Sequence, residues 1–427
     1  MPLREKKRIT SEIKLHKLSD KLTEILIFFV ILFSPWAFGS TQLWSIWTMN
    51  ITSYALGVLL IVKWFTRWTT GYKPIDKTPF NKELSPRLHR LKLINKICTA
   101  SIAILMFLLL GYILTSAINA RASFNLETHE YIYFEGINKN LPHSYDKKGT
   151  LFLFWQYLGL MLLFWAIRDW LSGASYHKKS IMLNPRLKKL LFLISINGGA
   201  LAIECILQKI YYGNENGKLL FSIYPSINIS NIAQFGPFAY RSNGGSYLNL
   251  IWPIALGLFI QLGQENLGNR KQRIGSGPEL IIIPCVILAA SGPIISSARG
   301  AAIVMIGLVI LIAVSLIFMK IRSKFVMRSA LFSLIIGIGI SYYLGWKALL
   351  PRLKNIFSDN MSSRIELYER TLEMINDYGA YGSGPGSFQT INQFELGLNS
   401  RWESWVHNDY LELLLTFGKP GTTIISL

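Results

Sequence analysis

Four side chains in the second half of the chain are of the types that phosphate chemistry needs. Arg241, Arg299 and Arg364 carry guanidinium groups, and His407 stands in the segment Trp-Val-His-Asn-Asp-Tyr. A guanidinium presents a planar fork of donors that matches phosphate oxygens and stays charged at any relevant pH. A histidine can take a proton from a hydroxyl nucleophile near neutral pH. If they share one site, these residues favour a transfer reaction in which a lipid diphosphate is the leaving group. Taken singly, each is more often a headgroup or salt-bridge contact.

Other chemical signatures are missing from the sequence. The histidines show no HxxxH or HExxH spacing, and Cys98, Cys205 and Cys285 form no CxxC pair, so neither a metal site nor a disulfide framework is expected. The glycine-rich segment 379–388 lacks the GK[ST] ending of a nucleotide-binding loop. It could bring backbone N–H groups close to a sugar or phosphate, or it could be a plain interhelical turn. We therefore expect no cofactor and no metal.

Glu204 is an acid within a strongly apolar stretch. Such a carboxylate could relay protons in a transporter, because charges inside a membrane are costly and are usually functional. It is a single acid near the end of its apolar stretch, which favours a plain hydrogen bond within a helical bundle.

The composition predicts the scaffold that must hold these residues. The chain has 427 residues, of which 51% are hydrophobic and 16% charged, whereas soluble domains average about 25% charged residues. Apolar runs long enough to cross about 30 Å of hydrocarbon recur along it. The sequence thus predicts an all-α fold, a polytopic bundle of transmembrane helices. Nine spans are predicted: 22–38, 43–65, 97–118, 150–171, 189–208, 248–264, 279–297, 301–319 and 329–349.

The distribution of positive charge predicts the orientation of these spans. Of the 44 Lys and Arg residues, 29 lie in alternate connections, namely 1–21, 63–96, 168–189, 270–273 and 320–328. Basic loops stay in the cytoplasm, so the N-terminus is predicted to be cytoplasmic and the four candidate residues to lie on the outer side. Because anionic headgroups explain the net charge of +20, and no nucleic-acid-binding motif accompanies it, we expect membrane lipids and no nucleic acid as partners.

The predicted division of the chain follows this topology. Residues 1–208 form the first five helices, and 209–349 form the next four with an outer loop at 209–247. Residues 350–407 form a helical outer-loop domain, in which Ile365, Leu367 or Tyr368, Leu372 and Ile375 follow a helical period that stops before Gly379. A second helix begins near His407. Residues 408–427 begin a tenth span, and we expect that span and at least one further hairpin to continue beyond Leu427.

The ordered outer-side motifs of residues 235–421 resemble those of the O-antigen ligase and polymerase family of bacterial inner-membrane proteins. The resemblance rests on Phe-Ala-Tyr-Arg-Ser-Asn at 238–243, the tight turn at 291–300, Arg364 followed by Gly-Ser-Gly-Pro-Gly-Ser-Phe at 382–388, His-Asn-Asp-Tyr-Leu at 407–411, and Phe-Gly-Lys-Pro-Gly at 417–421. The resemblance implies a GT-C-like glycosyltransferase bundle of ten to twelve spans, of which about ten are present here.

The same resemblance implies a function and a place in the cell. Such proteins take a glycan from an undecaprenyl diphosphate carrier at the periplasmic face of the inner membrane, and they need neither nucleotide nor metal. They pass it to lipid A–core, to another carrier-linked glycan or to a protein hydroxyl. Carried over to this sequence, Arg241, Arg299 and Arg364 would bind the carrier diphosphate, and His407 would be the general base.

Two other function classes remain open at this point. A secondary transporter or a flippase for a lipid-linked glycan would need broken helices or an inverted repeat around a polar midplane site, and neither is visible in the sequence. A scaffold protein without chemistry would make the candidate residues a coincidence. Within the favoured class, the sequence does not separate ligase from polymerase, because acceptor pockets are built from variable loops.

Overall fold

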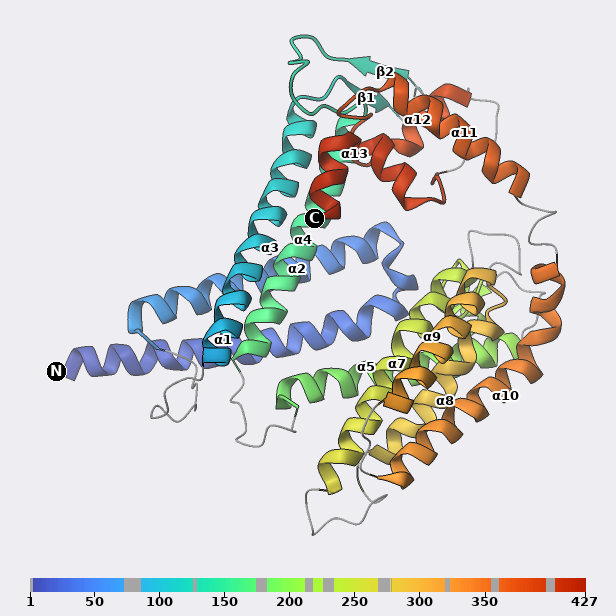
Figure 1. The fold of residues 1–427 in the computed structure, drawn as a ribbon. Coiled ribbons are helices and arrows are strands. Elements are labelled where there is room, and N and C mark those ends of the chain that lie inside the picture. Colours follow the sequence, from blue (N-terminus) through green and yellow to red (C-terminus); the bar gives the residue numbers. More distant parts are fainter. Residues whose placement is uncertain are drawn as a thin grey trace. The chain divides into compact units, whose positions relative to one another are not determined.

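The computed structural model is helical, with two short β-hairpins, and confirms the all-α fold (Figure 1). It describes residues 3–72, 86–125, 128, 130–173, 183–211, 218–225, 234–267, 277, 279–318, 323–354, 361–396 and 404–427. The predicted basic connection 270–273 and parts of the predicted loops 63–96 and 209–247 lie outside these residues. The hairpins, β1 (Ala122–Asn125) with β2 (Glu130–Tyr133) and β3 (Lys218–Leu219) with β4 (Tyr224–Pro225), were not predicted from the sequence.

Within the described residues, seven helices are long and apolar enough to cross a membrane. They coincide with seven of the nine predicted spans and fall in α2 (Leu43–Thr70), α3 (Pro86–Ile118), α4 (Lys147–Ser172), α5 (Pro185–Tyr211), α7 (Arg241–Leu267), α9 (Arg299–Phe318) and α10 (Lys324–Lys354). The predicted span 279–297 is the shorter apolar helix α8 (Glu279–Ile295), and 22–38 lies in α1 (Leu3–Trp36). The total of about ten spans stays a prediction.

The chain packs as two compact units. The first unit comprises residues 1–78 and 163–355, and the second comprises 79–162 and 356–427, so that α4 contributes to both. The four predicted segments follow chain order, whereas these units follow packing, and each unit is described by itself.

The first unit is built around α5, α7, α8 and α10. Trp252 and Leu248 are fully buried in its core. Close helix crossings depend on small residues: a Cβ at Gly292 would lie 2.1 Å from Leu248, and one at Gly345 would lie 2.8 Å from the backbone of Ile295. Small residues at such crossings let helix backbones approach closely, which is how helices associate in lipid.

The second unit holds α3, the β1–β2 hairpin, the first part of α4, and three helices near the end of the chain. These are α11 (Met361–Asp377), α12 (Phe388–Leu396) and α13 (Asp409–Ser426). The hydroxyl of Tyr112 on α3 donates to the carbonyl oxygen of Phe417 on α13 at 2.5 Å, and the two rings stack. Residues far apart in the sequence therefore form one packed body.

The amphipathic helix predicted after residue 363 is α11. Leu367, Thr371 and Met374 are buried at the spacing of one helical stripe. Ile365 and Leu372, which follow the predicted helical period, are 46% and 49% exposed and lie outside this stripe. Thr371 could replace an apolar residue in the stripe because its hydroxyl donates to the carbonyl of Leu367 at 2.6 Å.

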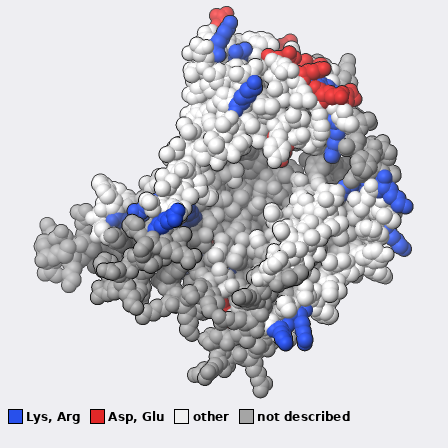
Figure 2. Space-filling model, in the orientation of Figure 1, with Lys and Arg blue, Asp and Glu red and all other residues white. Residues whose placement is uncertain are grey.

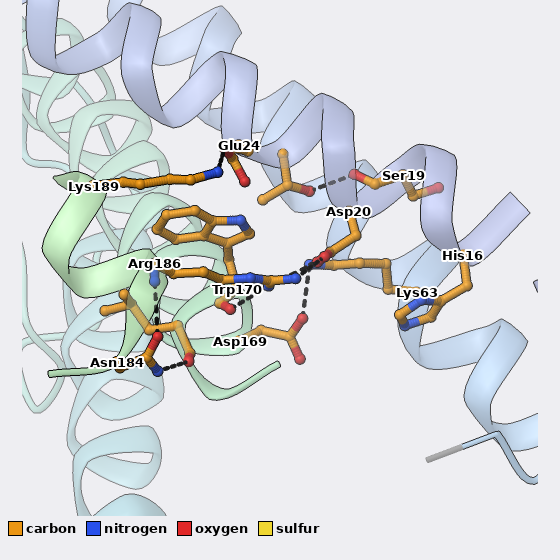
Figure 3. A network of polar contacts seen from close by, with 12 residues as sticks. His16, Ser19, Asp20, Glu24, Lys63, Asp169, Trp170, Asn184, Arg186 and Lys189 are labelled. Carbon is orange, nitrogen blue, oxygen red and sulfur yellow. Dashed lines mark hydrogen bonds and ion pairs between the residues drawn. The ribbon is translucent and has the colours of Figure 1, made fainter. Parts of the chain in front are cut away.

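A network of charges ties four helices of the first unit together at one end (Figure 3). Lys63 on α2 is fully buried and lies 3.2 Å from Asp20 of α1 and 2.8 Å from Asp169 of α4. Arg67 donates to both carboxylate oxygens of Asp169 and, through Nε, to His16 Nε2 at 3.0 Å. Since an isolated charge is costly in a low-dielectric interior, each cation here fixes the position of its acidic partner.

The helix α5 joins the same network. The Arg186 guanidinium pairs with Asp20 and lies over the ring of Trp170, 5.3 Å from its centroid. Lys189 and Glu24 form a more exposed pair at 3.1 Å. All these groups lie on the side that the charge pattern assigns to the cytoplasm, so the network closes one end of the helices.

Asp169→Asn is expected to destabilise the protein because it leaves Lys63 without its nearer carboxylate and replaces one of the two carboxylate oxygens that accept from Arg67 with an NH2 group. Removing one partner of a buried pair costs about 3–5 kcal/mol, whereas an exposed pair contributes about 0–1 kcal/mol. The thermal unfolding midpoint of the detergent-solubilised protein should therefore fall clearly for Asp169→Asn and little for the control Glu24→Gln. Equal shifts for the two variants would contradict the assigned role of the network.

Candidate functional site

Arg241 begins α7 directly after a tight turn that is packed into the first unit. Phe235 and Phe238 exchange backbone hydrogen bonds of 3.0 and 3.1 Å, and both rings are buried. Gly244 lies against both of them, since a Cβ there would be 2.9 Å from each ring. Arg241 itself is half-buried. The turn therefore fixes the position at which the arginine leaves the packed core.

Two polar side chains of α5, Gln208 and Glu204, lie next to this turn, and Gln208 is hydrogen-bonded to it. The amide of Gln208 accepts a hydrogen bond from the backbone N–H of Gly236 and donates to its carbonyl oxygen at 3.2 Å. Glu204 is buried, and its Oε1 accepts from the N–H of Phe221 at 2.8 Å. Glu204 is thus hydrogen-bonded, as predicted, but its partner lies in the predicted loop 209–247 and not in the helical bundle. Gly236 has a φ of +60°, and a Cβ there would lie 2.4 Å from Cys205 Sγ.

Arg299 begins α9 after a turn that is equally constrained. Ser297 adopts a left-handed φ of +56°, which side chains rarely adopt. The hydroxyl of Ser296 donates to the carbonyl of Pro293 at 2.7 Å and lies 3.3 Å from the N–H of Ala298, which donates to it. Arg299 is half-buried at the first position of the helix. The tight connection predicted from the sequence between these two helices is present.

The structure brings the starts of α7 and α9 together. A Cβ at Gly245, one turn after Arg241, would lie 2.6 Å from Ser296 Oγ and 2.8 Å from the side chain of Ala301. The Asn249 side chain donates to the carbonyl of Ala301 at 2.8 Å. Arg241 and Arg299 therefore lie at the same end of the first unit. At that end two helix N-termini add their positive dipole ends to two guanidinium groups, an arrangement that favours a phosphate anion.

His407 lies in the second unit, in a strained backbone conformation. Its φ is +59°, a left-handed value that costs an ordinary residue about 1–2 kcal/mol. The following residue, Asn408, caps α13 by accepting from the N–H groups of Tyr410 and Leu411. The carboxylate of Glu412 accepts from the N–H of Val406 at 3.0 Å. Contacts on both sides thus hold His407 in this conformation, and its side chain is exposed.

Arg364 lies on α11 in the same unit as His407. The hydroxyl of Tyr368, one helical turn after Arg364, donates to the carbonyl oxygen of His407 at 3.2 Å. Arg364 is exposed. The four predicted residues thus form two pairs, Arg241 with Arg299 in one unit and Arg364 with His407 in the other, and their convergence on one site stays a prediction.

Of the described histidines on the predicted outer side, His407 is the accessible one. His143 is 4% exposed and packs between the rings of Tyr145 and Tyr381. Burial, and secondly the charge of Arg121, lowers the pKa of His143, so that its imidazole is neutral at neutral pH. His129 lies outside the described residues. An acceptor hydroxyl from outside the protein could therefore reach His407 but not His143.

The glycine-rich segment contacts protein rather than offering open backbone. A Cβ at Gly382 would lie 2.3 Å from the carbonyl oxygen of Leu415, and one at Gly384 would lie 2.4 Å from Ser144 Oγ. Ser383 and Ser387 are fully buried. Of the two interpretations of this segment, the structure favours the plain interhelical turn.

A break in α13, absent from the sequence-based expectation, belongs to the same packing. Gly418 is non-helical, with a φ of +61° and a ψ of −174°. A Cβ there would lie 2.2 Å from the carbonyl of Ala380, and the N–H of Lys419 donates to that carbonyl at 3.0 Å. The broken helix therefore accommodates a neighbouring loop, which differs from the broken helices that line transporter sites.

The segment between α3 and α4 supports this region through contacts that the sequence did not predict. The carboxylate of Asp146 accepts from the Thr390 hydroxyl at 2.8 Å and from the N–H of Gly149 at 3.0 Å. The N–H of Tyr145 donates to the carbonyl of Ser383 at 2.9 Å. Most of these bonds involve backbone groups, which leave no residue pattern in the sequence.

Among the described residues, no three His, Cys, Asp or Glu side chains form a group that could hold a metal ion.

Gly236→Ala is expected to detach the turn from α5, because its Cβ has no room beside Cys205 and the φ disfavours a side chain. In a Cys98→Ser background the change should make the buried Cys205 reactive toward a maleimide. The control is Gly257→Ala on α7, whose Cβ would contact nothing within 4 Å. Unchanged protection of Cys205 in Gly236→Ala would refute the proposed anchoring.

Comparison with known proteins bears on the part of the chain that holds three of the four candidates. Residues 284–426 match the O-antigen ligase family, a region that includes Arg299, Arg364 and His407 but not Arg241. No curated protein and no solved structure matches the chain significantly. The family match confirms, for residues 284–426, the resemblance of this membrane protein to the O-antigen ligases.

Proposed function

We propose that the chain transfers a glycan from an undecaprenyl diphosphate carrier to an acceptor hydroxyl at the periplasmic face of the bacterial inner membrane. The family match supports a role in glycan transfer at a membrane in general terms. One observation carries the finer proposal: the matched region contains an exposed histidine in a strained conformation, stabilised by contacts from α11 and α13. Strain of this kind is characteristic of functional sites.

In the proposed mechanism, both pairs of residues act on the same substrate. Arg241 and Arg299 neutralise the carrier diphosphate with the help of the helix N-termini at which they lie, and Arg364 adds a third cation. Charge that develops on the departing diphosphate is then stabilised by groups already in place.

His407 completes the reaction. Its imidazole takes the proton of the acceptor hydroxyl while that oxygen attacks the anomeric carbon from the side opposite the diphosphate. The new glycosidic bond forms as the bond between the anomeric carbon and the diphosphate oxygen breaks, with inversion at that carbon. The diphosphate linkage supplies the free energy, so the step requires no nucleotide.

His407→Ala and Arg299→Ala are expected to abolish glycan transfer while the protein still inserts in the membrane. Loss of a general base reduces rates by about 10²–10⁴-fold, and loss of one charge-stabilising donor by about 10²–10³-fold. The measurement is transfer of a carrier-linked glycan by protein in membranes. Arg370→Ala serves as the control and should keep its transfer activity, because Arg370 is outside the proposed site and is paired with Glu366 at 3.6 Å.

The variant His407→Gly tests whether the imidazole is needed for transfer when the backbone conformation at this position is kept. Glycine tolerates the left-handed φ at no steric cost, so this variant should unfold at a temperature no lower than that of the unmodified protein, yet transfer no glycan. An inserted His407→Gly or His407→Ala protein with full transfer activity would falsify the assignment of the base.

Deletion of the gene distinguishes the two possible acceptors. If surface polysaccharide chains persist but lose their anchor, the protein is a ligase. If single repeat units stay attached and longer chains disappear, it is a polymerase. Unchanged surface polysaccharide would contradict both forms of the proposal.

A further inference from the structure

The second unit has an aromatic surface that the proposed mechanism does not use, formed by Tyr131, Tyr133 and Phe394. Tyr131 of β2 lies opposite Phe124 of β1, and their rings meet at a centroid distance of 5.2 Å. Tyr131 also contacts Tyr133, at 6.0 Å, and Phe394 of α12, at 5.1 Å. Figure 1 shows the hairpin beside α12. Phe124 is buried, whereas Tyr133 and Phe394 are 64% and 58% exposed.

The strand geometry explains why these rings are uncovered. Successive side chains of a strand point to opposite faces, so Tyr131 and Tyr133 share one face and Ile132 lies on the other. The residue opposite Tyr133 is Ala122, which is too small to cover the ring. Tyr131 is therefore covered by Phe124, while Tyr133 remains open to solvent.

The groups that carry these rings are held firmly. The N–H of Phe134 donates to the carbonyl of Arg121 at 2.9 Å, which closes the hairpin. The α12 helix is tied down by the bond from Thr390 to Asp146, and its Phe388 and Ile391 pack in the same cluster as Val406. The rings thus belong to the packed body that also carries His407.

Polar groups border the rings. Glu395, beside Phe394, is exposed and accepts from the Tyr378 hydroxyl at 3.4 Å. The Tyr131 hydroxyl is buried without a hydrogen-bond partner among the described residues. Burial, and secondly Tyr378, raises the pKa of Tyr131, so that its hydroxyl keeps its proton. An aromatic surface next to an exposed carboxylate suits a pyranose, which has an apolar C–H face and a rim of hydroxyl donors.

We propose that Tyr133 and Phe394, seated on Tyr131, form an aromatic platform that binds a pyranose ring of the glycan being transferred. The inference rests on the proposed function, because it assumes a glycan substrate. Stacking on the platform would hold the sugar chain while Glu395 accepts hydroxyl hydrogen bonds, and the platform would contribute to affinity rather than to the chemical step.

The charge on α11, which packs in the same cluster as α12, favours a glycan over a lipid surface. The exposed residues Glu366, Glu369, Glu373 and Asp377 line α11, and Figure 2 shows acidic side chains gathered over this helix. Like charges would repel an anionic membrane surface. A sugar with free hydroxyls carries no such penalty.

The test measures binding of soluble repeat-unit oligosaccharide, released from the surface polysaccharide of the strain that encodes the chain, to the full-length protein in detergent. Tyr133→Ala and Phe394→Ala should each raise the Kd by about three- to tenfold, the range expected for loss of one aromatic contact. Tyr133→Trp should restore binding. Ile132→Ala is the matched control, since Ile132 is 54% exposed on the opposite face of the same strand.

The remaining outcomes separate this proposal from the proposed function. His407→Ala should bind the oligosaccharide normally although it transfers none. If Tyr133→Ala and Phe394→Ala bind as tightly as the unmodified protein, the platform is refuted while the catalytic assignment stands. Equal losses in Ile132→Ala and Tyr133→Ala would also overturn the proposal, because the hairpin fold rather than the rings would then be responsible. The proposal would also be overturned if Tyr133→Ala and Phe394→Ala changed only the partition of the protein into lipid vesicles, because the rings would then be a membrane anchor.

Discussion

The first unit is organised by the cost of leaving a charge unpaired in an apolar interior. At one end of its helices, Lys63, Arg67 and Arg186 are neutralised by Asp20 and Asp169. Lys188 of α5 pairs with Glu265 of α7 at that end too, so the two helices run antiparallel. Arg241 lies at the other end of α7. With a helical rise of 1.5 Å per residue, it is about 36 Å from Glu265. At one end of the first unit, the cations are thus paired with acidic residues. At the other end, Arg241 and Arg299 lie at helix N-termini.

The sequence was most informative where a physical rule acts on many residues at once. Hydropathy predicted seven of the apolar helices, because burial in lipid demands a long uninterrupted run. A helical period located α11 as well, although two of the residues that follow it, Ile365 and Leu372, are exposed. A stripe that includes Thr371 is hidden from a search for apolar residues, since the threonine is buried through a backbone hydrogen bond.

The candidate site was less predictable. Motif order selected Arg241, Arg299, Arg364 and His407, but nothing in it indicated that they would fall in two packing units. The segment between α3 and α4 supports the region through bonds such as that from the Tyr145 N–H to the Ser383 carbonyl. Every residue except proline has such an N–H, so this pairing leaves no trace in composition or spacing. The aromatic platform depends in the same way on the register of a hairpin whose two strands have four residues each.

The left-handed backbone at residue 407 also bears on how this position changes during evolution. Glycine and asparagine fit that conformation better than histidine does. Folding alone would therefore drive the position toward those residues in any lineage that no longer used the imidazole. A gene copy that had lost its role should accumulate glycine or asparagine there early, while its helices still folded. The identity of this one residue can thus serve as a marker of whether a descendant of the protein is still under selection for its reaction.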